Sequence, residues 1–334
     1  MKKQSYYNYL VFLFSILSIS LFFTDCKKEN TIKFPKGIFP DSIYNLTAIN
    51  SAYDDYNVAL YQLSVTSPII FSSNRKSLGG QFDLEQASVS FNFDQTNGNF
   101  SLKSEMSNDP FLTKLINKAT TPGNDFGPYR MFSISDGFEY LFISSVNEAG
   151  NLDLFYLRNQ PVTGTTLPDV EGPLPVKLLN TSSDDAYLCL NSNFDSAYFT
   201  SNRDGNFDIY LHMLPTNKSL AMLFNMDYAT STKIDSVNST SDDKCPFVLN
   251  NILVFTSDRP GGFGGFDLYY SIFRNGNWSS PVNFGSKINS SSDEYRPVIA
   301  SAPDFTNLYM MFSSNRPGGK GGFDLYFTGF TFPK

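Results

Sequence analysis

The sequence predicts an all-β protein, a β-propeller of five four-stranded blades, and three observations support this fold class. First, a string with an aromatic-led strand, Ser-Asn-Arg, a glycine-rich turn and Phe-Asp-Leu-Tyr recurs, with its best copies at 255–270 and 312–327. Second, turn residues separate short strands about every 8–12 residues. Third, the 33 Phe and 19 Tyr residues favour pleated sheet. Four-stranded units repeated around an axis form a propeller.

An aspartate near the start of the third strand marks each unit and gives the number of blades. The copies are spaced by 70, 55, 59 and 57 residues and lie at Asp83, Asp153, Asp208, Asp267 and Asp324. A residue present in every unit has a framework role, and we expect each carboxylate to accept backbone N–H groups of the preceding turn. Six blades is the alternative, if 85–123 hides a degenerate blade. We predict instead a long hairpin at 85–106 and a short helix near 110–118.

An acidic pair follows a Ser- or Thr-rich turn at the start of each unit. One interpretation is a carboxylate ring at the channel mouth that binds a cation, with Ca²⁺ as the candidate ion, or a cationic partner. The structural interpretation, which we favour, pairs each carboxylate with an arginine of the Ser-Asn-Arg element. In the second unit we place Val146 at the arginine position. The pairs are Asp54 and Asp55, Asn124 and Asp125, Asp184 and Asp185, Asp242 and Asp243, and Asp293 and Glu294; the arginines are Arg75, Arg203, Arg259 and Arg316.

The fifth unit ends after its third strand, and the N-terminal segment offers the missing outer strand. Residues 39–57 align without a gap on 278–296, so that Phe39 meets Trp278 and Tyr56 meets Tyr295. We therefore expect residues 37–47 to pair with the fifth blade and to close the ring.

The glycine clusters at 261–265 and 318–322 are interpreted as turns and not as a phosphate-binding loop. No Lys-Ser or Lys-Thr follows them, and no helix begins there. Phe263 and Lys320 occupy the tips of these turns. We name them as candidate contact residues, because an aromatic and a basic side chain stand between glycines.

The first 25 residues have the pattern of a secretory signal, with Lys2 and Lys3 before an apolar run too short for a membrane span. Cys26 follows directly and resembles the lipid-attachment cysteine of bacterial lipoproteins. We expect a lipidated Cys26, a polar tether over 26–36 and a single propeller domain over 37–334. The resemblance implies an outer-membrane lipoprotein on the periplasmic or the surface side.

The remaining composition excludes several function classes. The net charge of −7 argues against a nucleic-acid partner, which needs a basic surface to displace counterions. A single histidine, His212, argues against a histidine metal cluster or a Ser-His-Asp triad. We expect no metal and no cofactor. Cys189 and Cys245 lie on adjacent inner strands; two buried free thiols are the default, and a disulfide is the alternative.

Sugar hydrolases also use five-bladed propellers, and they need two carboxylates about 5–10 Å apart. The inner strands predicted at 57–63, 129–134, 186–190, 247–250 and 297–300 contain no Asp or Glu. The acids that occur once, such as Asp136, Glu139, Asp195 and Asp304, fall in or beside hairpin turns. We therefore expect no enzymatic activity and keep glycosidase as the alternative.

The repeat as a whole resembles the TolB-type, WD40-like repeat of bacterial envelope proteins, in five copies over residues 37–334. The region 255–334 is similar to the repeats of outer-membrane propeller lipoproteins. The resemblance implies a monomeric propeller that binds envelope proteins as a scaffold. The alternative function is a carbohydrate-binding or glycoside-hydrolase-like propeller.

Overall fold

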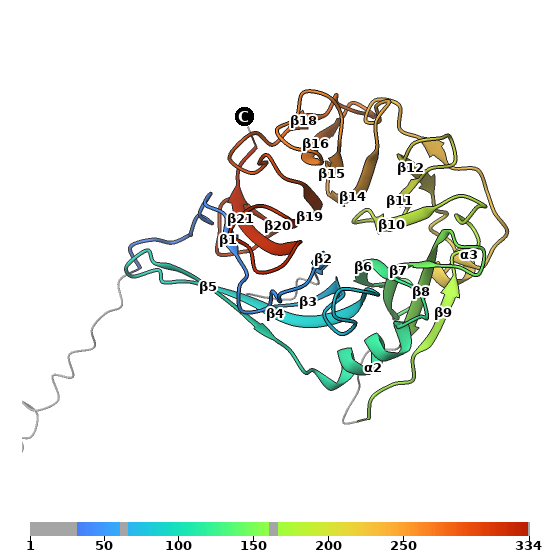
Figure 1. Cartoon of the computed structure of the whole chain (residues 1–334), viewed down its shortest axis with the longest axis horizontal. Helices are drawn as coiled ribbons and strands as arrows, with labels where there is room; N and C mark the ends of the chain where they lie inside the picture. Colours follow the sequence, from blue (N-terminus) through green and yellow to red (C-terminus); the bar gives the residue numbers. More distant parts are fainter. Residues whose placement is uncertain (1–31, 61–65, 160–165, 333–334) are drawn as a thin grey trace, which may run out of the picture.

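The computed structural model describes residues 32–60, 66–159 and 166–332. Five antiparallel sheets stand as blades around a central axis (Figure 1). The predicted signal segment and Cys26 lie outside the described residues. No helix within the described ranges is long and apolar enough to cross a membrane.

Each blade is a meander whose first strand lies next to the axis. Blade 1 contains β2 (Asp55–Leu60), β3 (Thr66–Ser73), β4 (Asp83–Phe93) and β5 (Phe100–Met106). Blade 2 contains β6 (Asp125–Phe132), β7 (Glu139–Val146), β8 (Leu152–Asn159) and β9 (Glu171–Pro175). Blade 3 contains β10 (Asp185–Leu190), β11 (Ser196–Ser201), β12 (Asp208–Met213) and β13 (Thr232–Lys233).

Each inner strand begins at the second acid of its acidic pair. The inner strands predicted from the sequence therefore begin one to four residues after the observed ones.

The last two blades, like blade 3, have outer strands of two residues. Blade 4 contains β14 (Asp243–Leu249), β15 (Ile252–Ser257) and β16 (Asp267–Arg274), with β17 (Asn277–Trp278) and β18 (Val282–Asn283) both paired to β16. Blade 5 contains β19 (Glu294–Ser301), β20 (Leu308–Ser314), β21 (Asp324–Phe330) and β1 (Tyr44–Asn45). Two short helices accompany the described blades, α2 (Pro110–Ala119) and α3 (Leu220–Phe224).

The number of blades is five, because residues 85–123 form a hairpin and a helix, as predicted. The turn between β4 and β5 uses Gly98 at φ +78°, which glycine adopts without strain. Helix α2 starts after Asp109, whose carboxylate accepts the N–H of Leu112 at 2.8 Å. The helix buries Leu112, Leu115 and other apolar residues with side chains of blades 1 and 2.

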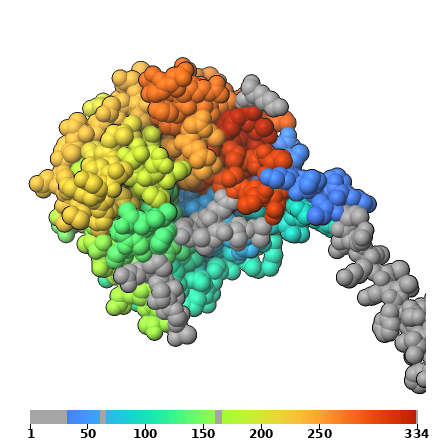
Figure 2. Space-filling view, turned by 180° about the vertical axis from the view of Figure 1, so that it is seen from behind, coloured from blue at the N-terminus to red at the C-terminus, as the bar shows by residue number. Residues whose placement is uncertain are grey.

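The ring is closed by the N-terminal segment, also as predicted. Tyr44 of β1 pairs with Phe327 of β21, so the first residues of the domain complete the last blade. Phe39 is 1% exposed and stacks on Phe305 with ring centroids 3.7 Å apart. Figure 2, which shows the opposite face, places the red C-terminal blade beside the blue N-terminal segment.

A bulge in each inner strand ties neighbouring blades together. The bulge contains one residue with positive φ in every blade: Asn57, Gly127, Tyr187, Cys245 and Arg296. In four blades the N–H of this residue donates to a hydroxyl on the second strand of the preceding blade. The pairs are Asn57 to Ser313, Tyr187 to Ser144, Cys245 to Thr200 and Arg296 to Thr256. The repeated Ser/Thr before the Ser-Asn-Arg element is therefore an inter-blade acceptor.

Candidate functional site

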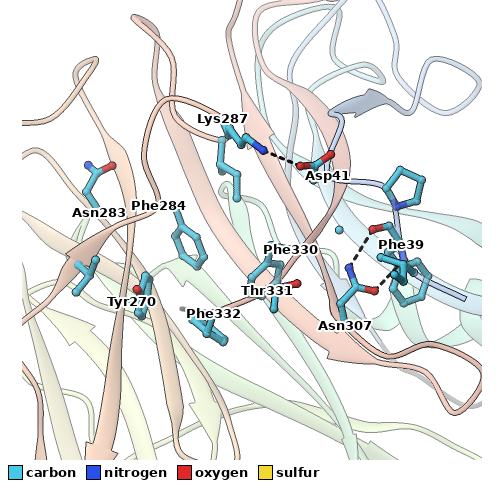
Figure 3. Close-up of a pocket in the computed structure, with 15 residues that line it drawn as sticks. Phe39, Asp41, Tyr270, Asn283, Phe284, Lys287, Asn307, Phe330, Thr331 and Phe332 are labelled. Carbon is cyan, nitrogen blue, oxygen red and sulfur yellow. Dashed lines mark hydrogen bonds and ion pairs between the residues drawn. The ribbon is translucent and has the colours of Figure 1, made fainter. Parts of the chain in front are cut away.

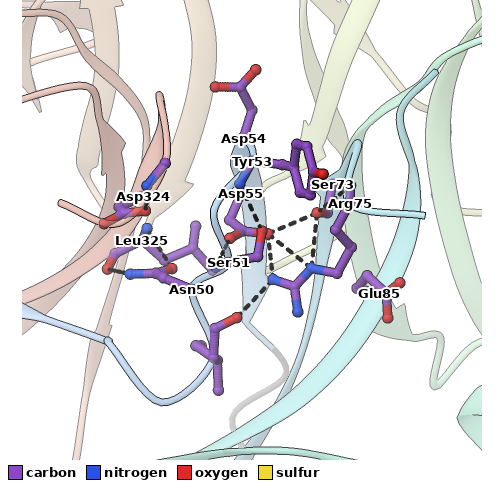
Figure 4. Close-up of polar contacts among 12 residues, drawn as sticks. Asn50, Ser51, Tyr53, Asp54, Asp55, Ser73, Arg75, Glu85, Asp324 and Leu325 are labelled. Carbon is purple, nitrogen blue, oxygen red and sulfur yellow. Dashed lines mark hydrogen bonds and ion pairs between the residues drawn. The ribbon is translucent and has the colours of Figure 1, made fainter. Parts of the chain in front are cut away.

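The second acid of each pair is buried and is bound within its own blade. Asp185 and Asp243 each contact an arginine Nη2 at 2.5 Å, and Glu294 contacts Arg316 at 2.8 Å. Figure 4 shows the corresponding pair of Arg75 and Asp55. The carboxylate side chains are fully buried, whereas the arginines are 13–19% exposed. These carboxylates support the turn before their own strand and leave no exposed acidic ring from this set.

The first acid of each pair joins one blade to the preceding blade. In all five blades its Oδ1 accepts a backbone N–H of the preceding blade, at 2.8–3.0 Å. The donor is the residue directly before that blade's repeat aspartate. The acceptors are Asp54, Asn124, Asp184, Asp242 and Asp293. Because an amide oxygen accepts equally well, Asn124 performs this role without a charge. Among the described residues, no group of three His, Cys, Asp or Glu side chains could hold a metal ion.

The second blade differs from the sequence alignment by one position. Asp125 pairs in register with Ser145, as Asp185 does with Ser201, so Asn147 and not Val146 occupies the arginine position. Asp125 instead accepts hydrogen bonds from the backbone and hydroxyl of Thr121. Burial without a cation raises the pKa of Asp125.

The repeat aspartates have partners that vary with the turn. Asp267 and Asp324 accept N–H groups from the glycine turn, at 2.6–3.2 Å. Asp208 binds Lys233, and Asp83 accepts a bond from Gln81. In the described part of blade 2, burial raises the pKa of Asp153. The predicted N–H acceptance is therefore present in the two blades with the best repeat copies.

The glycine turns fit against the next blade and do not form an open cradle. A Cβ at Gly321 would lie 1.9 Å from the carbonyl oxygen of Tyr53, and one at Gly264 would lie 1.9 Å from that of Ser292. At the predicted tips, Phe263 is 50% exposed, whereas Lys320 donates to the carbonyl of Asn50 at 3.1 Å. The two tips are not equivalent, since the lysine side chain is hydrogen-bonded to the segment before β2 and the Phe263 ring is half exposed.

Three acids considered for hydrolysis have structural partners. Asp136 accepts the hydroxyl of Tyr140 at 2.6 Å, and Glu139 forms a salt bridge with Arg130. Asp195 accepts bonds from the side chains of Asn191 and Ser196. These contacts stabilise the hairpins between first and second strands, as their sequence positions suggested.

The remaining single residues considered are buried or half-buried. Cys189 and Cys245 are free thiols, and burial raises the pKa of each to about 12. His212 approaches the hydroxyl of Ser231 at 3.2 Å, and burial lowers its pKa.

A pocket of about 690 Å³ lies between blades 4 and 5, and the sequence analysis did not identify it. We call it the aromatic groove. Its rings come from β16, the segment after β18, and the end of blade 5, while residues 38–41 form the other wall. Figure 3 shows Tyr270, Phe284, Phe330 and Phe332 together on one side and Phe39 with Asn307 on the other. Alternation in Phe330-Thr331-Phe332 was the signal available in the sequence.

The rings of the groove form a connected cluster with edge and tilted contacts. Tyr270 lies 5.0 Å from Phe284 and 4.7 Å from Phe332, and Phe284 lies 5.5 Å from Phe330. Tyr270 and Phe330 are buried, whereas Phe284 and Phe332 are half-buried and keep ring surface open to the pocket.

Polar groups lie along the rim of the aromatic groove. Lys287 binds Asp41 at 2.7 Å, and both side chains are more than two-thirds exposed. The Thr331 side chain is also exposed. A second pocket of about 350 Å³ shares Tyr270, Val282 and Phe332 with the groove and adds Arg274 to the lining. The two pockets therefore form one extended surface with an aromatic floor and polar edges.

The comparisons with known proteins show the fold. No protein-family model matches the sequence, and no curated protein matches it. An exo-β-1,3-galactanase, 1,3Gal43A from Clostridium thermocellum, has 14% identity and a TM-score of 0.50 over 89% of this chain and 63% of its own. A further glycoside hydrolase has 6% identity and a TM-score of 0.51 over 89% and 96%. An α-L-arabinofuranosidase from Podospora anserina has 11% identity and a TM-score of 0.46 over 90% and 98%.

These findings correct two predictions made from the sequence. The predicted protein-binding scaffold without enzymatic activity is contradicted, because the two solved propellers that resemble this chain with TM-scores of 0.50 and 0.51 are glycoside hydrolases. The five-bladed propeller is established, but its TolB type is not supported by these structures. The carbohydrate-active alternative agrees better with the comparisons, although identities of 6–14% establish only the shared fold.

Proposed function

We propose that this protein is carbohydrate-active and that a glycan chain binds in the aromatic groove. The observation that carries the proposal is the cluster of four rings with the exposed Lys287 and Asp41 at its rim. Ligand pockets combine an apolar, aromatic lining with a few polar groups that fix orientation. The groove has this composition.

Sugars match this arrangement because they are amphipathic. A pyranose ring presents C–H groups on its faces and hydroxyls around its edge. The C–H hydrogens are attracted by the negative face of an aromatic ring, and the half-buried Phe284 and Phe332 offer such surface. The hydroxyls at the edge can bond to a carboxylate and an ammonium group, which Asp41 and Lys287 provide.

The fold supports the same class of ligand. The exo-β-1,3-galactanase that resembles this chain gives β-1,3-linked galacto-oligosaccharides as the first probe. The extended surface that joins the two pockets suits an oligosaccharide better than a single sugar.

Replacing Phe284 with leucine is expected to weaken oligosaccharide binding roughly tenfold, because the apolar volume stays and the aromatic face is lost. Isothermal titration of a panel that begins with β-1,3-galacto-oligosaccharides measures this. Phe284→Trp is expected to keep the affinity, and Phe263→Leu, which changes an exposed ring outside the groove, is the matched control. Equal affinity of Phe284→Leu and wild type would rule out the groove as the sugar site.

Incubation of the protein with the same oligosaccharides, followed by an assay for released reducing ends, measures hydrolysis. Two carboxylates about 5–10 Å apart are needed for glycosidic cleavage. Asp41 is the one carboxylate among the residues that line the groove within the described chain. Turnover that survives Asp41→Asn would place the acid pair outside the groove, while loss of turnover and binding together would place Asp41 at the substrate.

We further propose that the protein is exported and anchored to the outer membrane through a lipid on Cys26. The basic start, the apolar run and the position of this cysteine support the proposal. Cys26→Ser is expected to abolish incorporation of labelled palmitate and to release the protein into the soluble envelope fraction. Labelling that persists in the variant, or a wild type without label, would contradict it.

A further inference from the structure

Strand β5 leaves one edge of blade 1 unpaired. It has seven residues, Phe100–Met106, and pairs only with β4, so its other edge lies along the rim of the propeller (Figure 1). An unpaired strand edge presents free backbone N–H and C=O groups and is a template for another strand. No strand of the described blades covers this edge.

The other outer strands are protected in ways that β5 is not. Strands β1, β13, β17 and β18 have two residues each, and β9 contains Pro173 and Pro175, which cannot donate a backbone hydrogen bond. Strand β5 is longer and has no proline. Among the outer strands of the described chain, β5 is therefore the one suited to pair with a strand of another molecule.

The pairing with β4 shows which backbone groups of β5 point outward. The N–H of Asp94 donates to the carbonyl of Asn99 at 2.9 Å, and the N–H of Ser107 donates to the carbonyl of Gln86 at 3.2 Å. Between these two pairs the register runs without a shift, so every second residue of β5 bonds to β4. The alternate residues direct their N–H and C=O groups to the free edge, and they are Phe100, Leu102, Ser104 and Met106.

The charges on β5 are arranged so that the strand complements itself. The side chains of Lys103 and Glu105 are 69% and 57% exposed. When two copies of β5 pair antiparallel about a two-fold axis at Ser104, Lys103 of each copy faces Glu105 of the other. An axis at Lys103 or at Glu105 would place like charges directly opposite each other, which is unfavourable. Only the axis at Ser104 sets each lysine opposite a glutamate.

Backbone and apolar groups fit the same register. Ser104 directs its N–H and C=O to the free edge, so the two copies of Ser104 exchange two hydrogen bonds at the axis. Leu102 of each copy faces Met106 of the other, and Met106 is 41% exposed in the single chain. The pairing therefore covers apolar surface as well as the free backbone groups.

We propose that two copies of this protein associate through antiparallel pairing of their β5 strands about a two-fold axis at Ser104. The partner is a second copy, because Lys103 and Glu105 complement their own strand in this register. The pairing joins the two copies of blade 1 into one continuous sheet. It replaces the monomer that the family resemblance implies, and it does not depend on glycan binding in the aromatic groove.

Sedimentation velocity of charge-reversed variants tests the proposal. The wild type is expected to dimerise as its concentration rises to about 0.3 mM. Lys103→Glu sets glutamate opposite glutamate in both halves of the interface and is expected to weaken the dimer roughly tenfold. Glu105→Lys sets lysine opposite lysine and is expected to have the same effect. An equimolar mixture of the two variants is expected to restore association, because each glutamate then faces a lysine.

Lys218→Glu is the matched control, since it reverses an exposed charge between β12 and α3 and is expected to leave dimerisation unchanged. A wild type that remains monomeric at about 0.3 mM would overturn the proposal. A dimer that Lys103→Glu does not weaken would also overturn it, because another surface would then hold the two copies together.

Disulfide trapping tests the register separately. The variants carry Cys26→Ser, and the buried Cys189 and Cys245 stay in place. Ser104→Cys is expected to cross-link on mild oxidation, because the Cα atoms of a hydrogen-bonded antiparallel pair lie about 5.5 Å apart. Ser101→Cys is the control, since the two copies of residue 101 lie about 20 Å apart in this register and no cross-link is expected. Equal cross-linking of the two variants would overturn the proposed pairing.

Discussion

Replacing Phe39 with alanine is expected to lower the free energy of unfolding by about 3–5 kcal/mol, the range for a buried phenylalanine. Phe39 stacks on Phe305 and contacts Phe91 edge-on at 5.0 Å, so it fills the joint between the last blade and the first. Its backbone N–H and carbonyl are both bound by the side chain of Asn307. Truncation leaves a cavity where the ring closes, and Asn307 continues to hold the backbone.

Urea denaturation followed by fluorescence measures this change. Phe34→Ala is the control, because Phe34 lies in the same N-terminal segment and is 44% exposed. We expect the control to unfold with nearly the wild-type free energy. A Phe39→Ala variant as stable as the control would show that residues 37–47 do not hold the ring together.

Replacing Arg259 with methionine is expected to cost about 3–5 kcal/mol, because it leaves the Asp243 carboxylate buried without its cation. Arg259 binds Asp243 at 2.5 Å, donates to the carbonyl of Val237 at 2.8 Å, and lies 4.9 Å from the ring centre of Tyr269. Methionine keeps much of the apolar stem, so the loss reports the charge and its hydrogen bonds.

Thermal and urea unfolding of Arg259→Met can be compared with Lys103→Met. Lys103 also forms an ion pair, with Glu105 at 2.6 Å, but both side chains are more than half exposed. Exposed pairs contribute little, and we expect almost no change there. Equal effects of the two substitutions would contradict a structural role for the acidic pairs.

The sequence was sufficient to predict the blade count and the ring closure, because both depend on the repeat itself. The alignment of 39–57 on 278–296 predicts that the N-terminal segment supplies the outer strand of blade 5, and the structure confirms this. The register of β1 is shifted by one residue, since Tyr44 pairs with Phe327 and the gapless alignment predicts Tyr326. The ion pairs between the arginines and the acids were also predictable, because both residue types occur at fixed positions in most units.

Features that occur once were not predictable in the same way. Asn147 was misplaced by one residue because the second copy of the repeat has lost its arginine, and only strand register shows the position. The aromatic groove combines Tyr270, Phe284 and Phe332 with residues 38–41, which become neighbours only when the ring closes. Its site therefore depends on tertiary structure and not on a motif.

The most direct test of the central claim is a crystal structure of the protein with a bound oligosaccharide. The account predicts a sugar ring stacked on Phe284 or Phe332, with hydroxyls in contact with the Lys287 and Asp41 pair. Sugar bound elsewhere on the propeller with an empty groove would contradict it.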